Sequence, residues 1–179
     1  SIQAFKNKKP YGEIFLQEFS KNQANQGSVE YTSKYSEFYE SNRNHTLTDG
    51  KIGSLNFKDG NWQGFFGKDI ECIIDLKETI SVSKVKSSFF QYSNSWIFLP
   101  EYLEIQLSED GKNWIKTKKK KPIQTPRKRG QFKEEISVDF DDEMARYIKI
   151  KAENRGLVPN WHEAAGSKSW LFIDEVIVE

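Results

Sequence analysis

The chain has 179 residues, of which 36% are hydrophobic and 14% are aromatic. Lys and Arg number 27 against 26 Asp and Glu, so the formal net charge of +1 provides no global field to attract nucleic acid or a membrane surface. This length suits one domain with one sizeable core, and the heavy use of Phe and Trp favours sheets over helices.

Residues 1–10 are polar and basic, and we expect a linker remnant or a poorly ordered terminus there. From residue 11 on, short alternating apolar runs recur between turn-forming residues, without a helical apolar period. Strands are expected at residues 12–19, 28–31, 70–76, 80–90, 102–108, 131–140, 146–152 and 169–178. We therefore predict that residues 11–179 form a single all-β domain, an antiparallel β-sandwich.

Two short features refine this prediction. The only cysteine, Cys72, lies in an apolar run and is expected to be a buried thiol that acts as a small hydrophobe. Asp110 and Gly111 stand between two strand-like runs, which predicts a hairpin turn.

No apolar stretch approaches the ~20 residues needed to span a bilayer, so we expect no membrane insertion.

A glycine-rich turn at residues 46–54 contains a carboxylate, hydroxyls and several carbonyls. Calcium is bound by oxygen ligands of these kinds, often from a tightly curled loop. On spacing alone, however, Asp49-Gly50 is more often only a turn.

The order of Asp49-Gly50, Ser54, residues 108–114, residues 146–150 and Glu175 resembles that of a discoidin domain. The sequence is similar to coagulation factor 5/8 type C domains and to family 32 carbohydrate-binding modules, particularly the carboxy-terminal piece of bacterial family 20 β-hexosaminidases. The likeness runs from about residue 10 to residue 179 and is also carried by residues 47–50, 61–65, 73–76, 95–100 and 170–175. It implies a jelly-roll sandwich of the galactose-binding-domain-like type.

The resemblance also implies a structural calcium ion. Its ligands would be Asp49, Ser54, the carbonyl of Thr46, and Glu175 on the last strand, so that the ion joins an early loop to the end of the chain. The alternative is that Asp49 only caps a turn and Glu175 is a solvated strand residue. Residues 56–57 depart from the usual family pattern, which keeps this alternative open.

Aromatic residues in expected loops are the second functional signal, because a sugar ring can pack its C–H face on an indole or a phenol. We expect ligand contacts from Tyr92, Trp96, Trp161 and His162, with Trp62 as a weaker candidate. The alternative for Trp96 is that its ring fills the core, because the apolar residues 97–99 follow it.

Basic residues are concentrated at residues 116–121 and 127–129. We interpret them as a solvated, mobile hairpin extension. The alternative is that they bind a sulfated or uronic glycan. Aromatic or glycine-rich segments do not interleave the run as they do in nucleic-acid readers, so no nucleic-acid partner is expected. Neither His45 nor His162 stands in a recognisable catalytic motif, and the acidic residues 141–143 suit a solvent-facing turn.

The sequence therefore predicts a non-catalytic carbohydrate-binding module with modest affinity, in roughly the micromolar to millimolar range. By resemblance, it would be a monomeric ancillary domain that contacts the catalytic domain of a secreted, periplasmic or surface-bound bacterial glycoside hydrolase of the β-hexosaminidase type. The alternative is a structural or protein-interaction domain that braces a catalytic domain and binds no sugar.

Overall fold

The computed structural model describes residues 2–6, 9–15 and 22–179. Near the amino terminus, β1 (Ile2–Lys6) and β2 (Lys9–Phe15) pair as an antiparallel hairpin, where we expected a linker or a poorly ordered terminus up to residue 10. The strand expected at residues 12–19 overlaps β2, and its residues 16–19 lie outside the described part of the chain.

The body of the molecule is a seven-stranded antiparallel sheet system in the order β4-β9-β5-β8-β6-β7, with β3 also paired to β5. Its strands are β3 (Ser28–Tyr31), β4 (Gln63–Phe66), β5 (Ile70–Gln91), β6 (Leu103–Ser108), β7 (Ile115–Lys120), β8 (Phe132–Ala152) and β9 (Trp170–Val178). The helical turns are η1 (Glu37–Tyr39), η2 (Arg43–Thr48) and η3 (Ser93–Ser95). The expected all-β antiparallel fold is confirmed.

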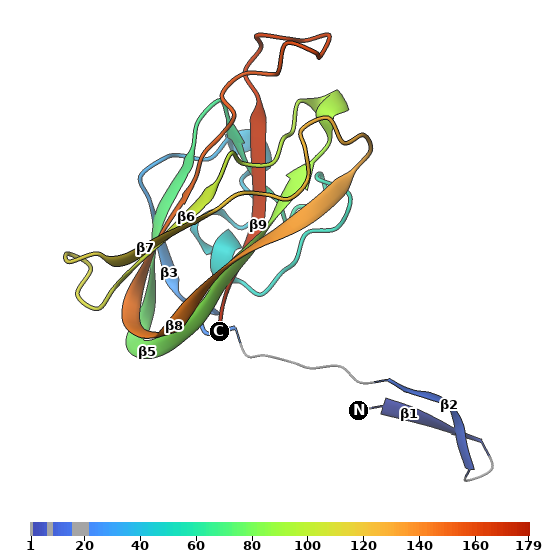
Figure 1. Ribbon diagram of the computed structural model, residues 1–179, viewed down its shortest axis with the longest axis vertical. Coiled ribbons are helices and arrows are strands. Elements are labelled where there is room, and N and C mark those ends of the chain that lie inside the picture. Colours follow the sequence, from blue (N-terminus) through green and yellow to red (C-terminus); the bar gives the residue numbers. More distant parts are fainter. Residues whose placement is uncertain (1, 7–8, 16–21) are drawn as a thin grey trace.

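Two long strands, β5 and β8, form the ribbon that both layers share. They pair from Ile70 opposite Ala152 to Gln91 opposite Phe132, with an irregularity between Asp75 and Ile80. The first half of β5 also pairs with β3, and the second half pairs with β9, so the ribbon bends from one layer into the other (Figure 1). The strands expected separately at residues 70–76 and 80–90 therefore form one bent strand, β5. Those expected at residues 131–140 and 146–152 form another, β8.

Alternating side chains of these strands fill the space between the layers. Ile74, Ile105 and Ile148 are fully buried there, and Cys72 is 1% exposed. Burial raises the pKa of the Cys72 thiol to about 12, so the thiol remains protonated and packs as a small hydrophobe, as expected. No helix among the described residues is long and apolar enough to cross a bilayer.

A second buried cluster lies under the loops at one end of the sandwich. It consists of Trp62, Phe90, Ile97 and Phe172, and half-buried rings pack against it. This aromatic cluster supports the loops that carry most of the predicted site residues.

The lysine-rich run, interpreted from the sequence as a mobile hairpin extension, forms strand β7 instead. Its backbone pairs with β6, and the Lys119 ammonium lies 2.7 Å from the Glu104 carboxylate. The Lys118 ammonium donates to the carbonyl of Asp139 over 2.8 Å. Regular pairing with a neighbouring strand therefore holds this charged segment in the sheet.

Candidate functional site

The turn that follows β5 turns the ring of Trp96 outward. The backbones of Tyr92 and Ile97 bond to each other, with N–H to O distances of 3.0 and 3.2 Å, which closes the turn. Trp96 adopts a left-handed backbone conformation with φ of 60°, which is unfavourable for a bulky residue. Its ring is 36% exposed while the next residue, Ile97, is 1% exposed, so Trp96 does not fill the core.

The loop between β8 and β9 carries Trp161 and His162 at the same end of the sandwich as this turn, at the top of Figure 1. Trp161 is 40% exposed, and its ring centroid lies 5.8 Å from that of His162. Both rings meet the buried ring of Phe98 edge-on, at 6.3 and 6.4 Å. Phe98 therefore anchors the pair to the core.

His162 has a defined hydrogen-bonding arrangement. Its Nδ1 accepts a hydrogen bond from the backbone N–H of Ala164 over 3.1 Å. In the neutral imidazole the proton is therefore assigned to Nε2, which leaves that atom as a donor for a ligand hydroxyl.

Gln91 connects the Trp96 turn to the loop between β7 and β8. The side chain is fully buried, and its Oε1 accepts from the backbone N–H of Leu99 over 3.4 Å. Its Nε2 lies 3.2 Å from each of the carbonyl oxygens of Thr125, Pro126 and Lys128. This buried amide fixes the backbone on both sides of residue 127.

The residue fixed in this way, Arg127, completes the surface that we call the Trp161 platform, which consists of Trp161, His162 and Arg127. The guanidinium carbon of Arg127 lies 5.6 Å from the centroid of the Trp161 ring, within the range of a cation–π contact. Two loops that are distant in sequence therefore meet at one exposed surface with an indole, an imidazole and a guanidinium.

An aromatic groove of about 620 Å³ lies among the loops, and Trp62 is the only one of its lining residues that the sequence analysis predicted as a ligand contact. We define this aromatic groove by Phe38, Tyr39, Phe57 and Trp170, with Glu40, Ser41, Lys58 and Gly60 as further lining residues. Phe38 is 89% exposed, so its ring at this groove is open to solvent. The backbone N–H of Trp170 donates to the carbonyl of Trp96 over 2.8 Å, so the groove and the Trp96 turn adjoin.

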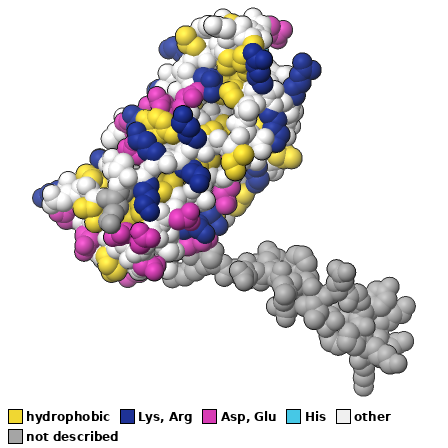
Figure 2. All heavy atoms as spheres, viewed as in Figure 1, with side chains coloured by type: hydrophobic (Ala, Val, Ile, Leu, Met, Phe, Trp, Pro, Cys, Tyr) yellow, Lys and Arg dark blue, Asp and Glu magenta, His cyan; other side chains and the backbone are white. Residues whose placement is uncertain are grey.

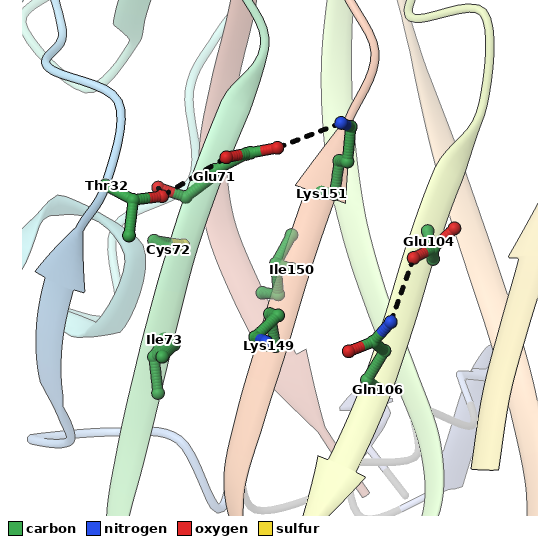
Figure 3. A pocket seen from close by; sticks show the side chains of 9 residues that line it. All are labelled: Thr32, Glu71, Cys72, Ile73, Glu104, Gln106, Lys149, Ile150 and Lys151. Atoms are coloured by element: carbon green, nitrogen blue, oxygen red, sulfur yellow. Dashed lines mark hydrogen bonds and ion pairs between the residues drawn. The ribbon is translucent and has the colours of Figure 1, made fainter. Parts of the chain in front are cut away.

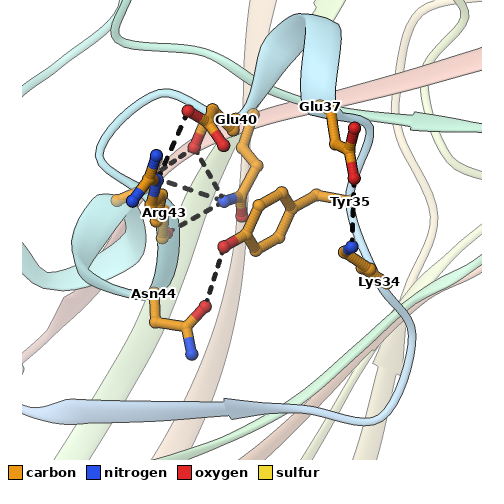
Figure 4. A network of polar contacts seen from close by, with 8 residues as sticks. Lys34, Tyr35, Glu37, Glu40, Arg43 and Asn44 are labelled. Atoms are coloured by element: carbon orange, nitrogen blue, oxygen red, sulfur yellow. Dashed lines mark hydrogen bonds and ion pairs between the residues drawn. The ribbon is translucent and has the colours of Figure 1, made fainter.

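A polar network holds the loop that brings Phe38 and Tyr39 to the groove (Figure 4). The Nε2 of buried Gln63 donates to the carbonyls of Glu40 and Arg43 over 3.2 and 2.9 Å. The Glu40 carboxylate pairs with Arg43 at 3.3 Å, and the Tyr35 hydroxyl donates to Asn44 over 2.9 Å. The groove wall is therefore positioned by the sheet, through Gln63 of β4.

The structure corrects the expectation for Trp62. Its ring is 1% exposed, packs edge-on against Phe90 at 5.3 Å, and donates from Nε1 to the carbonyl of Ser54 over 3.0 Å. A Cβ at Gly53 would lie 2.2 Å from this ring, so the glycine allows the chain to cover the indole. Trp62 is a core residue that closes the floor of the groove, and Tyr92 is half-buried against the same aromatic cluster.

Glu175, one of the predicted calcium ligands, is a buried carboxylate and is not solvated. Its Oε1 accepts from Asn22 Nδ2 over 3.0 Å and from the N–H of Gly50 over 3.1 Å. Its Oε2 is buried without a hydrogen-bond partner. Burial, together with the charges of Asp49 and Asp174, raises the pKa of Glu175 to about 8. An orphaned buried oxygen beside a second carboxylate fits a hard cation.

The other predicted calcium ligands have partners within the protein. Asp49 caps its turn by accepting from Lys51 N–H over 3.0 Å, and it also accepts from Asn42 over 2.8 Å. Ser54 is exposed, and its hydroxyl accepts from the N–H of Asn56 over 3.1 Å. Thr46 is 1% exposed. In the described residues, no three or more His, Cys, Asp or Glu side chains form a metal-binding group, so a site here would depend on two carboxylates supplemented by neutral oxygens.

No protein-family model and no curated protein matches the sequence. Solved structures do match in fold. The lectin domain of lectinolysin in complex with Lewis B antigen aligns with a TM-score of 0.59 at 16% identity, over 89% of this chain and 96% of that one. A Streptococcus pneumoniae fucose binding module aligns with a TM-score of 0.58 at 19% identity, over 92% and 98%. Chitosan-binding module 1 from a Paenibacillus chitosanase/glucanase aligns with a TM-score of 0.52 at 13% identity, over 89% and 99%.

These alignments cover the sandwich almost end to end. The chain has the discoidin-type jelly-roll fold. The fold class expected from the sequence is thereby confirmed, and the discoidin-type sandwich presents both the Trp161 platform and the aromatic groove on its loops.

A second hollow, of about 330 Å³, lies on the sheet face formed by β3, β5, β8 and β6 of the discoidin-type sandwich (Figure 3). Its carboxylates are already paired with cations, because Lys151 lies 2.9 Å from Glu71 and Lys119 lies 2.7 Å from Glu104. Charged groups that are already paired within the protein contribute little to the binding of a ligand, so this hollow is the weaker candidate site.

Proposed function

We propose that this chain is a non-catalytic carbohydrate-binding module that holds a glycan at the loop end of its sandwich. The observation that carries the proposal is the juxtaposition there of exposed rings with hydrogen-bonding groups. Indole and phenyl faces suit the C–H face of a sugar, while His162 Nε2 and the polar groove residues suit its hydroxyls. The similar structures named above include a lectin domain and fucose- and chitosan-binding modules, which supports this proposal.

Titration calorimetry of the whole chain with Lewis B, fucose and chitosan oligosaccharides, followed by a broad glycan array, tests this function. We expect at least one glycan to bind in roughly the micromolar to millimolar range. Trp161→Ala or Phe57→Ala should weaken binding at least tenfold while the circular dichroism spectrum is unchanged. Ile123→Ala is the matched control, because Ile123 is an exposed apolar residue outside both surfaces.

Absence of binding to every glycan on the array would overturn the proposal and favour a structural or protein-interaction domain. That alternative also calls for an apolar patch on a sheet face, whereas the hollow of Figure 3 is surrounded by paired charges.

We also propose that a calcium ion binds at Glu175 and Asp49, with the Thr46 carbonyl and Ser54 as the further ligands. The partnerless Oε2 of Glu175 supports this proposal. A bound cation would supply positive charge between two carboxylates and so join the early turn to the last strand.

Thermal unfolding of chelator-treated protein tests the calcium proposal. We expect millimolar calcium to raise the midpoint of the transition, with a dissociation constant of ~10⁻⁴–10⁻³ M, and magnesium to have a smaller effect. Glu175→Gln should abolish the calcium response. Asp139→Asn, at a carboxylate that is 71% exposed, should retain it. An unchanged midpoint on calcium addition would contradict the proposal.

The resemblance of the sequence further supports a proposal about the parent protein. We propose a bacterial glycoside hydrolase of the β-hexosaminidase type, secreted, periplasmic or attached to the cell surface, with this monomeric domain beside its catalytic domain. The structurally similar chitosan-binding module also comes from a chitosanase/glucanase. Reading the coding sequence on both sides of this segment tests the parent, and light scattering tests the monomer.

A further inference from the structure

The basic residues of the chain fall into two groups with different surroundings. The first group belongs to β7, where Lys119 pairs with Glu104 and Lys118 bonds to Asp139. The second group, Arg127, Lys128 and Arg129, lies in the loop before β8 and is exposed. We call it the basic loop.

The cations of the basic loop have no acidic partner among the described residues. Other cations of the sandwich do: Arg146 binds Asp75 at 2.8 Å, and Lys151 binds Glu71 at 2.9 Å. In the basic loop, by contrast, Arg127 contacts the ring of Trp161, and the Lys128 ammonium lies 4.3 Å from the ring centre of Phe132. Its guanidinium and ammonium groups therefore retain N–H donors for an outside acceptor.

The backbone of the basic loop is fixed although its side chains are exposed. Buried Gln91 holds the carbonyls on both sides of Arg127, and the N–H of Lys128 donates to the carbonyl of Thr125 over 3.1 Å. On the amino-terminal side, the Glu134 carboxylate accepts from the N–H of Gln124 over 3.0 Å. A guanidinium held in this way over an indole loses less freedom on binding than a free surface arginine does.

The charge around the platform is mainly positive. Glu163 is exposed in the same loop as Trp161, and the Glu134 carboxylate beside the basic loop already accepts from the backbone N–H of Gln124. Across the face shown in Figure 2, basic side chains are widely spread, while acidic ones lie mostly in its lower part, away from the loop end. A ligand at the loop end therefore meets more positive than negative charge although the whole chain is nearly neutral.

We propose that the glycan bound at the Trp161 platform is anionic, with a sulfate ester or a uronic carboxylate that Arg127 binds while the sugar ring packs beside Trp161. A guanidinium offers two parallel N–H donors to the paired oxygens of either group. This inference rests on the proposed glycan binding and specifies its ligand class.

Matched ligands that differ only in charge test the inference on the whole chain. Calorimetry compares a sulfated galactan oligosaccharide with its desulfated form, and an oligogalacturonate with its methyl ester. We expect at least one charged form to bind tenfold or more tightly than its neutral counterpart, and this ratio to fall as NaCl rises from 50 to 200 mM. The pair that shows the preference identifies sulfate or carboxylate as the source of the charge.

Arg127→Gln should reduce the ratio to about one, because it weakens binding of the charged form more than binding of the neutral form, and Arg127→Lys should give an intermediate ratio. Lys112→Gln removes the same charge from the exposed turn between β6 and β7, and it should keep the full ratio.

Four results would overturn the inference. Neutral and charged forms could bind equally, or the preference could survive Arg127→Gln; in both cases glycan binding itself would stand. Equal affinity of the chain for a short DNA duplex and for the sulfated galactan would instead indicate unspecific attraction to polyanions. Absence of binding to every saccharide, neutral or charged, would remove the proposed function and this inference together.

Discussion

At the scale of single residues, the backbone conformation of Trp96 decides whether its ring is available to a ligand. The left-handed conformation at φ 60° turns the indole outward and lets Ile97 enter the core instead. Such a conformation costs a residue with a Cβ roughly 1–2 kcal/mol, and glycine adopts it freely. The structure thus accepts backbone strain at the position that exposes an aromatic ring.

Two substitutions that remove the same ring separate this strain from packing. We expect Trp96→Gly to be more stable than Trp96→Ala by about 1 kcal/mol in urea unfolding, because only glycine relieves the strained backbone. The ordinary order, with alanine more stable, should hold at Trp161, which lacks a positive φ. An alanine variant that equals or exceeds the glycine variant at position 96 would contradict this account.

Residue-scale exposure was only partly predictable from the sequence. Trp62 and Trp96 both lie in segments rich in turn-forming residues, yet one is buried and the other exposed. The difference depends on the absence of a side chain at Gly53 and on the sign of φ at Trp96, neither of which the tryptophan itself reveals. The groove residues Phe38 and Phe57 were missed because they follow no strand period and meet only in three dimensions.

At the scale of elements, the bend of the β5–β8 ribbon is secured by an ion pair. The Nε and Nη2 atoms of Arg146 bind the two carboxylate oxygens of Asp75 at 2.8 and 3.0 Å. The Arg146 hydrogen bond holds the pKa of Asp75 down at about 2, from an ordinary value of 3.8. Because the folded-state pKa is depressed, the resulting stability is present above pH 4 and is lost as the pH falls towards 2.

The pH dependence of Asp75→Asn tests this ion pair. At pH 7 we expect the variant to unfold about 1 kcal/mol more easily than the original chain, a modest value because the Arg146 side chain is 38% exposed. Urea unfolding at a series of pH values should show the difference shrinking to zero near pH 2. Asp139→Asn, at an exposed carboxylate, should show no comparable trend. A constant difference at all pH values would contradict the ion-pair explanation.

The loops of the site depend on Gln91 in a similar way. In Gln91→Met, the carbonyls of Thr125, Pro126 and Lys128 lose a buried donor, which should cost about 1–3 kcal/mol. Hydrogen exchange should speed up at residues 92–99 and 121–131 and remain unchanged at residues 171–178 of β9. Gln106→Met, on the sheet face of Figure 3, is the control. Protection that stays unchanged in both loops would show that Gln91 does not position them.

Strands with a clear alternation were the predictable elements. The match is exact for β3 and within one residue for β6 and β9. The sequence analysis predicted two strands in place of each long strand of the ribbon, because the residues at the bend are polar, as the residues of a loop are. It missed β4, which is short and contains Gln63 and Gly64, and β7, whose lysines resemble a solvated segment although pairing with β6 orders them.

At the scale of the whole molecule, the early part of the chain is fastened to its last strand. The backbone N–H of Gln23 donates to the carbonyl of Val178 over 2.9 Å, and the N–H of Gly53 donates to the Asp174 carboxylate over 3.0 Å. These contacts span most of the sequence, so pattern alone could not supply them. The resemblance to discoidin domains implied a link between an early loop and the last strand only through a calcium ion.

Asn22 makes the densest set of these contacts. Its Nδ2 donates to Glu175 Oε1 and to the carbonyl of Val176, both at 3.0 Å. Its Oδ1 accepts from the N–H groups of Ala24 and Val178, again at 3.0 Å. One side chain therefore satisfies two backbone groups of the last strand and one oxygen of a buried carboxylate.

Removal of this side chain should weaken the whole fold. We expect Asn22→Ala to lower the free energy of unfolding by about 2 kcal/mol, because it leaves partly buried groups of β9 without partners. Asn25→Ala, at an exposed position three residues later, should change it by less than about 0.5 kcal/mol. Urea unfolding should remain a single transition in both variants, since β9 is central to the sheet and cannot be released alone. A loss below 0.5 kcal/mol in Asn22→Ala would show that the two ends of the chain are held together by the apolar core and not by this hydrogen-bonded junction.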